Sequence, residues 1–390
     1  MNGPSLPPPP LPRVVIPHGG NLDDAVRRFG IAREQWLDLS TGINPDGYPV
    51  PTIDPQAWLR LPDDDDDLEA VAAACYGAAN ALAVAGTQAA IRMLPQLLSA
   101  GTVGISALTY GEYGPAFEHA GFPVDRFVSG PLVDAINPSL HSGIIAEGNP
   151  MVAERGLPVD GHVRHVDVHS QAESDPVQLV AGQALPAHWR HLVIVNPNNP
   201  TTEVFDTATL LDWHAQLVAR GGYLIVDEAF ADATPAHSIA FASDRPGLIV
   251  LRSVGKFFGL AGARAGFMLA ERALLETARL LRGPWTVTGP ARAVVRAALL
   301  DTTWQQATRA HLPLAAARLA ALLEARGLCV FRTTLFAWTP DLRAAALHNA
   351  LAKTGIWVRY FDRIPSLRFG LPSDESGWAA LQDGLQRAVC

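Results

Sequence analysis

Short apolar runs alternate with helix-like stretches through the first two thirds of the 390-residue chain. Apolar and β-branched residues fill 103–105, 192–195, 223–226, 248–251 and 265–269. Between these runs lie stretches with helical periodicity, for example 89–98 and 208–220. This alternation is typical of an α/β domain built on a mostly parallel sheet. In such sheets ligands bind beyond the carboxyl ends of the strands, so the residues that follow each run are the first candidates for a site.

The pattern changes near residue 286, where alanine- and leucine-rich helices at 291–300 and 314–326 precede short runs. The runs lie near 328–331, 336–338, 357–359 and 367–369 and predict short strands of a smaller α+β domain. We therefore expect an N-terminal arm with a short helix (1–40), a large domain (41–285) and a small domain (286–390). The short helix covers 23–29 and ends at Gly30.

Three segments depart from the alternation. Residues 1–12 are rich in proline and predict either a stiff extended arm or a tail of no consequence. The acidic run 63–67 is expected to be the solvated start of a helix at 68–76, with a metal site as the less favoured interpretation.

Residues 137–183 are rich in histidine, glycine and proline and favour a surface insertion. His162, His165 and His169 near Asp167 leave a metal site as the alternative there.

The composition narrows the class of protein. It is 48% hydrophobic and 17% charged, which indicates a compact chain, and the net charge of −8 argues against nucleic-acid binding. The N-terminal residues do not have the pattern of a signal peptide. No apolar run of about 18 residues predicts a membrane span. Cys75, Cys329 and Cys390 are scattered, so neither a disulfide framework nor a zinc site is expected, and a reducing cytoplasm fits.

Only two lysines occur, Lys256 and Lys353, and the first lies in a glycine-rich, otherwise apolar segment. Around it, Ser253 and Arg264 are donors that suit a phosphate dianion. The glycine spacing does not match a dinucleotide-binding fingerprint. Lys256 is therefore a candidate reactive amine rather than a surface charge.

Other candidates follow predicted strands. Asp227 comes directly after an apolar run and is either a helix cap or the counter-charge of a ring nitrogen, which it would keep protonated. Asn199, between two prolines, is either part of a plain turn or a donor to a ring oxygen. Gly86, Thr87 and Gln88 precede a helix whose N-terminus can cup a phosphate.

The order of these motifs, with Tyr110 between the first and the Pro-Asn-Asn-Pro loop, resembles fold-type-I pyridoxal 5'-phosphate (PLP) enzymes of the aminotransferase subgroup. The likeness runs from His18 on. It implies a large domain with a mostly parallel sheet and a smaller α+β domain, with Lys256 as the Schiff-base lysine. It also implies partner residues for the ring and the phosphate of PLP: Asp227 at the ring nitrogen, Asn199 at the ring oxygen, Tyr110 stacked on the ring, and Gly86, Thr87, Gln88, Ser253 and Arg264 around the phosphate.

Within that group the chain resembles the threonine-phosphate decarboxylase family. The likeness rests on His-Gly-Gly-Asn at 18–21, Leu-Asp-Leu-Ser at 37–40, Ile-Asn-Pro at 43–45, Gly-Pro-Trp at 283–285 and Trp-Gln-Gln at 304–306. The resemblance implies a cytoplasmic homodimer that decarboxylates L-threonine O-3-phosphate for assembly of the cobalamin nucleotide loop, without a metal. His18, Asn44, Arg359 and Arg368 are the substrate-binding candidates. An aminotransferase of the histidinol-phosphate type and a non-catalytic partner in cobalamin assembly remain alternatives.

Four positions depart from the family pattern. Leu61 and Phe230 stand where tyrosines are usual, and Gly255 replaces a hydroxyl residue before the lysine. Pro372 stands where the decarboxylases have an arginine. We expect weaker cofactor contacts and a substrate-phosphate site rebuilt from other residues.

Overall fold

The computed structural model describes residues 18–130 and 177–388. The proline-rich arm, Cys390 and the possible metal ligands Asp167, His162, His165 and His169 therefore lie outside the described residues, as does the insertion up to residue 176.

The large sheet contains eight strands in the order β2-β9-β8-β7-β6-β3-β4-β5. Their bounds are Leu82–Val84 (β2), Thr102–Ser106 (β3), Val124–Val128 (β4), Val177–Gln178 (β5), Trp189–Val195 (β6), Tyr223–Asp227 (β7), Leu248–Ser253 (β8) and Gly266–Ala270 (β9). Strands β8 to β5 pair in parallel, and β9 pairs antiparallel with both β8 and β2. The mostly parallel sheet predicted from the apolar runs is confirmed.

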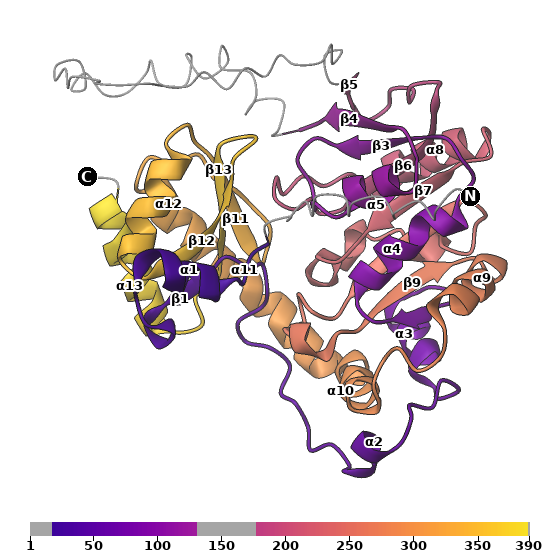
Figure 1. Cartoon of the computed structure of the whole chain (residues 1–390), viewed down its shortest axis with the longest axis horizontal. Helices are drawn as coiled ribbons and strands as arrows, with labels where there is room; N and C mark the ends of the chain where they lie inside the picture. Colours follow the sequence, from indigo (N-terminus) through magenta and orange to yellow (C-terminus); the bar gives the residue numbers. More distant parts are fainter. Residues whose placement is uncertain (1–17, 131–176, 389–390) are drawn as a thin grey trace, which may run out of the picture.

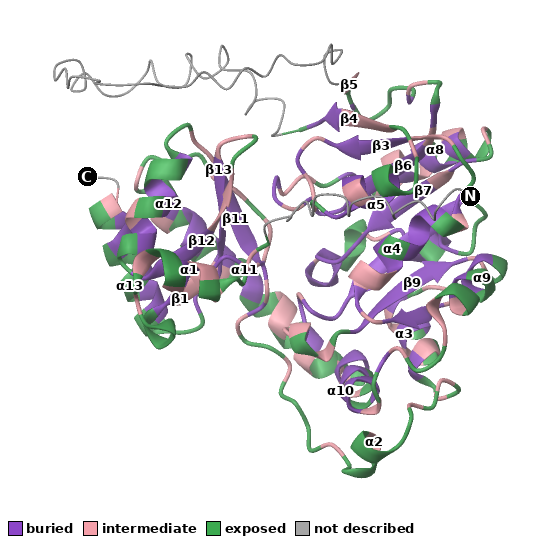
Figure 2. Cartoon of the chain, in the orientation of Figure 1, coloured by how far each residue is buried: buried purple, intermediate pink, exposed green. Residues whose placement is uncertain are grey.

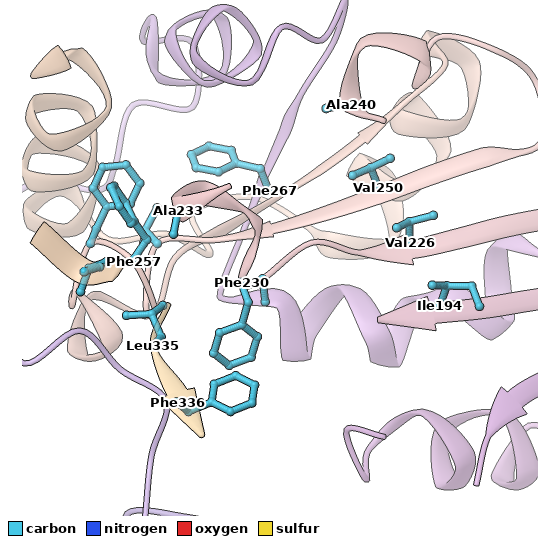
Figure 3. Close-up of a cluster of buried hydrophobic side chains, with 14 of the residues drawn as sticks. Ile194, Val226, Phe230, Ala233, Ala240, Val250, Phe257, Phe267, Leu335 and Phe336 are labelled. Carbon is cyan, nitrogen blue, oxygen red and sulfur yellow. The ribbon is translucent and has the colours of Figure 1, made fainter. Parts of the chain in front are cut away.

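Helices cover both faces of this sheet (Figure 1). Successive residues of a strand point to opposite sides, so the apolar strands carry buried side chains on both faces. Ile194, Val226 and Val250 lie in register on β6, β7 and β8 and belong to one buried cluster (Figure 3). The neighbouring Val193 and Ile225 belong to a second cluster on the other face. The first face is covered by α3 (Leu68–Tyr76), α8 (Thr207–Val218) and α10 (Gly289–Leu300), and the second by α4 (Thr87–Leu97), α5 (Tyr113–His119) and α9 (Arg272–Arg282).

A second sheet of five strands has the order β1-β12-β13-β11-β10. Its strands are Leu37–Leu39 (β1), Phe331–Arg332 (β10), Phe336–Pro340 (β11), Ile356–Phe361 (β12) and Ser366–Gly370 (β13). The helices α1 (Leu22–Phe29), α12 (Ala344–Lys353) and α13 (Glu375–Ala388) lie beside it (Figure 1). Strand β1 joins this sheet in parallel with β12, so an N-terminal segment completes the C-terminal sheet. The domain limits given above stay a prediction.

Helix α11 (Thr302–Glu324) begins well before the predicted start at 314. The Asp301 side chain caps it by accepting the backbone N–H of Trp304 at 2.9 Å, and Pro313 lies within the helix. The helix contacts β10 and β11 of the second sheet and the 3-10 turn Ala231–Ala233 beside the large sheet. It therefore connects the two sheets.

The acidic run before α3 is not merely solvated, which corrects the prediction. Asp64 receives Arg282 Nη2 at 3.1 Å and Arg292 Nη1 at 3.3 Å, and Asp67 receives Arg296 at 2.6 Å. The arginines come from α9 and α10, so the carboxylates hold these two helices against the start of α3. Position in the sequence alone does not reveal such partners.

Within 18–130 and 177–388, no helix is long and apolar enough to cross a membrane. The same residues contain no group of three or more histidine, cysteine or acidic side chains that could hold a metal ion.

Candidate active site

The candidate residues meet where the chain order of the large sheet reverses. Strand β6 lies between β3 and β7, so the connections after β3 and β6 diverge at this point. Asp227 lies at the carboxyl end of β7, paired with Val195 of β6 and Leu251 of β8. Such a switch point leaves a crevice for ligands in parallel sheets.

Asp227 is buried, with 3% of its surface exposed, and its carboxylate is fully engaged. The Tyr113 hydroxyl donates to Oδ2 at 2.7 Å and the backbone N–H of Ala229 to Oδ1 at 2.9 Å. Burial raises the pKa of Asp227, and these two hydrogen bonds and the charge of Lys256 oppose that rise. A buried carboxylate of this kind is suited to a cationic partner such as a protonated ring nitrogen.

Lys256 lies in the loop after β8, near both Asp227 and Arg368. Burial lowers the pKa of its amine to about 8, with further lowering by Arg368 and opposition from Asp227. Its Nζ stands 5.5 Å from the centre of the Phe230 ring. Phe230 in turn packs edge-on against Phe336 at 5.0 Å (Figure 3). The amine thus has a lowered pKa and lies beside an apolar wall formed by Phe230 and Phe336.

The predicted phosphate site, called the phosphate cradle below, lies at the N-terminus of α4. Gly86 begins the helix with a φ of 76°, and a Cβ there would come within 2.7 Å of Arg264 Nη2. The first N–H groups of a helix have no partners inside it, so those of Thr87 and Gln88 suit an anion. Ser253, 8% exposed, ends the neighbouring strand β8. Hydrogen-bond donors that suit an anion therefore surround Gly86: the N–H groups of Thr87 and Gln88, the Ser253 hydroxyl and the Arg264 guanidinium.

Asn199 and Tyr110 come from the loops after β6 and β3. The side-chain oxygen of Asn199, Oδ1, accepts a hydrogen bond from Arg368 Nη1. The Tyr110 hydroxyl donates to Gln88 Oε1 at 3.1 Å, and burial and the charge of Glu112 raise the Tyr110 pKa to about 12. Gln88 therefore links the phosphate cradle to the ring expected to stack on the cofactor.

Two arginines approach from the second sheet. Arg359 on β12 lies directly opposite Arg368 in the register of the antiparallel strand β13. Arg368 donates from Nη2 to the carbonyl oxygen of Ser40 at 2.6 Å, while its buried Nε has no hydrogen-bond partner among the described residues. Burial and the charge of Arg359 lower the Arg368 pKa to about 9. Paired cations of this kind favour an anionic ligand.

His18 is brought to the same place by a contact that the sequence did not predict. Its Nε2 lies 2.7 Å from Oε1 of Glu112, the residue before α5. A carboxylate can only accept, so His18 donates from Nε2. Glu112 is 5% exposed and is not among the candidates that the sequence indicates. The sequence offers only its acidic character and its position two residues after Tyr110 as signals.

Asn44 contacts the lysine loop rather than an open space. Its Nδ2 donates to the carbonyl oxygen of Phe257 at 2.9 Å, and its backbone N–H donates to that of Lys256 at 3.0 Å. Its Oδ1 accepts the N–H of Asp46 at 3.0 Å. In this structure Asn44 is an anchor for the lysine loop, and a contact with substrate stays a prediction.

The four departures from the family pattern have different surroundings. A Cβ on Gly255 would come within 3.2 Å of the Ala261 Cα, so the loop leaves little room for a hydroxyl side chain. Phe230 fills the apolar wall next to Lys256, and Leu61 is 67% exposed near α2 (Gln56–Leu59). Pro372 follows β13 and faces α13 at Gly377. Taken together, the cradle, the buried Asp227 and the Lys256 amine fit a phosphorylated pyridine aldehyde.

Comparisons with known proteins show the family of the chain. A model of the family described as "Aminotransferase class I and II" matches residues 166–375. The chain is 43% identical over 372 residues to a threonine-phosphate decarboxylase of Pseudomonas aeruginosa, covering 95% of this chain and 97% of the relative. It is 38% identical over 380 residues to one from Sinorhizobium, covering 95% and 98%.

Solved structures show the fold. Histidinol-phosphate aminotransferase of Sinorhizobium meliloti, in complex with PLP, superposes with a TM-score of 0.69 at 17% identity, covering 96% of this chain and 95% of that one. The fold-type-I expectation is thus confirmed, whereas the sequence relatives narrow the family. The chain belongs to the class I and II aminotransferase family and, within it, to the threonine-phosphate decarboxylases.

Proposed function

We propose that this enzyme uses PLP to decarboxylate L-threonine O-3-phosphate to (R)-1-aminopropan-2-yl phosphate for the cobalamin nucleotide loop. The observation that carries the proposal is the setting of Lys256, whose buried amine is close enough to the carboxylate of Asp227 and the guanidinium of Arg368 for both charges to act on its pKa. The Asp227 carboxylate suits the ring nitrogen of the cofactor, and the Arg368 guanidinium suits an anionic amino acid. Extended identity with decarboxylases supports the choice of reaction.

The chain's own residues would hold PLP at both ends. Gly86, Thr87, Ser253 and Arg264 would bind its phosphate, with Gln88 beside them. Lys256 would hold the aldehyde carbon and Asp227 a proton at the ring nitrogen. When bound, PLP supplies a ring that accepts the electron pair released as the carboxylate leaves.

Two further side chains orient the ring. Asn199 would face the ring oxygen, and Tyr110 would cover one face of the ring. Arg368 donates to Oδ1 of the Asn199 side chain. The amide nitrogen Nδ2 of Asn199 therefore stays available to donate to the ring oxygen. This orientation supports a role for Asn199 as a hydrogen-bond donor.

Substrate orientation is assigned to the two arginines of the second sheet and to His18 in the N-terminal segment. Threonine phosphate carries a carboxylate and a phosphate, and Arg359, Arg368 and His18 would bind them. These residues would favour decarboxylation over other reactions at the substrate Cα by where they hold the substrate carboxylate. The Lys256 Nζ, with its pKa lowered to about 8, would then return a proton to the substrate Cα.

Product analysis tests the reaction. Purified enzyme with PLP and threonine phosphate should release carbon dioxide without 2-oxoglutarate. A strict need for an oxo-acid acceptor would instead favour an aminotransferase of the histidinol-phosphate type. A PLP absorbance band that is present in the wild type and absent in Lys256→Ala would contradict a non-catalytic partner protein.

A homodimer in the cytoplasm is also part of the proposal. Helix α2 stands at the surface with Trp58 and Leu59 70% and 75% exposed (Figure 2). Leu280 and Trp285, 85% and 52% exposed, lie on and just after α9. Exposed apolar surface of this kind supports a partner copy. Sedimentation of the purified protein at several concentrations measures its oligomeric state.

A further inference from the structure

Glu112 is a buried carboxylate for which the proposed reaction gives no role. It lies just before α5, and its side chain is 7% exposed. Leaving a charge in such a place is costly unless several donors satisfy it. The identity of those donors therefore indicates what the carboxylate does.

Three donors from different parts of the chain meet at Glu112. Oε1 accepts from His18 Nε2 at 2.7 Å. Oε2 accepts from Gln88 Nε2 at 2.6 Å and from Arg92 Nη2 at 3.1 Å. Gln88 and Arg92 belong to α4, whose first residues form the phosphate cradle, whereas His18 comes from the N-terminal segment.

The same hydrogen bonds reach Tyr110. Gln88 donates to Glu112 with its amide nitrogen, which leaves its Oε1 to accept from the Tyr110 hydroxyl at 3.1 Å. The imidazole of His18 lies 6.0 Å from the Tyr110 ring. Glu112 thus fixes the amide of Gln88 and, through it, the hydroxyl of the tyrosine.

The segment that carries His18 is held at its other end by the second sheet. The backbone N–H of Gly20 donates to the Ser40 hydroxyl at 2.7 Å, and a Cβ on Gly19 would clash with the Ser40 carbonyl oxygen. That same carbonyl oxygen accepts from Arg368 Nη2 at 2.6 Å. His18 to Gly20 therefore join Glu112 on the large-sheet side to Arg368 on the other.

We infer that Glu112 is a positioning residue, which holds His18 at the substrate side of the site and Tyr110 at the cofactor side in one hydrogen-bonded unit. The inference rests on the proposed roles of His18 and Tyr110. Glu112 would act through these two side chains, because its carboxylate is buried and already accepts from three donors. Its contribution is to order a side chain that is 46% exposed and would otherwise be free to rotate.

Glu112→Gln is the informative substitution because it keeps the shape and removes the charge. A carboxylate can accept from all three donors, but an amide accepts on one side only and presents N–H groups on the other. Glutamine at 112 would thus set its own donors against those of Gln88 and Arg92 or against His18. Glu118→Gln is the matched control, since Glu118 lies on α5, which Glu112 immediately precedes, and forms an exposed pair with Arg126.

The first experiment is a double-mutant cycle on the holoenzyme, with His18→Ala and Glu112→Gln made singly and together. Loss of one charge-assisted hydrogen bond corresponds to about tenfold. We expect each single variant to raise the KM for threonine phosphate by about that factor with kcat little changed, and the double variant to raise it no further. Glu118→Gln should match the wild type.

The second experiment does not depend on catalysis. Hydrogen exchange of the cofactor-free protein, followed by mass spectrometry, should be faster for the peptide that contains Gly20 in Glu112→Gln than in the wild type. If that variant does not fold, Glu112→Asp replaces it, because the shorter side chain keeps the charge near α4 but withdraws from His18.

Several results would overturn the inference: KM effects that multiply in the double variant, a Glu112→Gln enzyme with wild-type KM, or unchanged exchange at Gly20. An effect on kcat and cofactor content alone would indicate a structural role and also overturn it. Failure of the wild type to release carbon dioxide would refute the proposed function instead, and the exchange experiment would still decide whether Glu112 holds His18.

Discussion

Arg359 and Arg368 face each other directly across the β12–β13 pair. Like charges at opposite positions of antiparallel strands destabilise a sheet, and burial lowers the pKa of both guanidiniums. An arrangement that is unfavourable in the free enzyme becomes favourable when an anion lies between the two cations. The proposed role of the pair in binding an anionic substrate agrees with this balance of charges.

Replacing Arg359 with glutamine should therefore separate binding from stability. We expect the KM for threonine phosphate to rise about tenfold to a hundredfold, because a charge-assisted contact is lost. The free energy of unfolding should change by less than about 1 kcal/mol, because relief of the like-charge repulsion offsets the loss of the contact between the Arg359 guanidinium and the Phe361 ring. Kinetics and urea denaturation measure the two effects. Arg343→Gln, which removes an exposed arginine paired with Asp341, is the control and should leave KM unchanged.

The lowered pKa of Lys256, about 8 against an ordinary 10.5, predicts how stability depends on pH without cofactor. Between these values the unfolded chain binds a proton that the folded chain does not, so stability rises with pH across that window. Below pH 8 the charged amine must stay in its site.

Lys256→Met in the cofactor-free protein should then be more stable than the wild type by about 1–3 kcal/mol at pH 7. This advantage should shrink as the pH rises from 8 towards 10.5. Urea denaturation at a series of pH values measures it. Lys353→Met changes an exposed lysine and should give no pH-dependent difference, and an equal gain at every pH would contradict the explanation.

Gly86→Ala tests the phosphate cradle. A methyl group there would push against the guanidinium of Arg264, so we expect PLP affinity to fall about tenfold or more. Gly77→Ala is the control for a glycine with positive φ, since Gly77 has a φ of 66° and nothing within 4 Å of a Cβ. Gly77→Ala should lose about 1–2 kcal/mol of stability from backbone strain, and Gly86→Ala should lose more, because its ψ of 160° lies in a region that residues other than glycine rarely adopt. Fluorescence titration with PLP compares them, and equal affinity in both would argue against the cradle.

Asn44→Ala distinguishes an anchor from a substrate ligand. The Asn44 side chain is buried and holds the backbone of Phe257 and Asp46. Its loss should cost about 1–3 kcal/mol of unfolding free energy and weaken PLP binding. Asn21→Ala, at the exposed start of α1, removes one hydrogen bond without touching the lysine loop and should leave PLP affinity unchanged. A rise in KM with normal stability would instead support direct contact with substrate.

Local pattern was sufficient for the frame of the large domain. Apolar runs placed strands β3 and β6 to β9 within a few residues, and Gly30 correctly marked the end of α1. These features depend on side-chain periodicity and on backbone conformations that neighbouring residues determine. The start of α11 was wrong by twelve residues, since the cap at Asp301 carries little signal outside its context.

The sequence by itself determined the fold class and the family, and it indicated Lys256 and Asp227 as candidates, because strand ends and motifs are properties of short stretches of chain. It did not indicate Tyr113, whose hydroxyl donates to Asp227. Only the tertiary structure decided which distant groups meet. It brought His18 to Glu112 across 94 residues, set Arg359 opposite Arg368, and turned Asn44 onto the lysine loop. Contacts of this kind depend on strand register and on how two sheets pack, which no local pattern encodes.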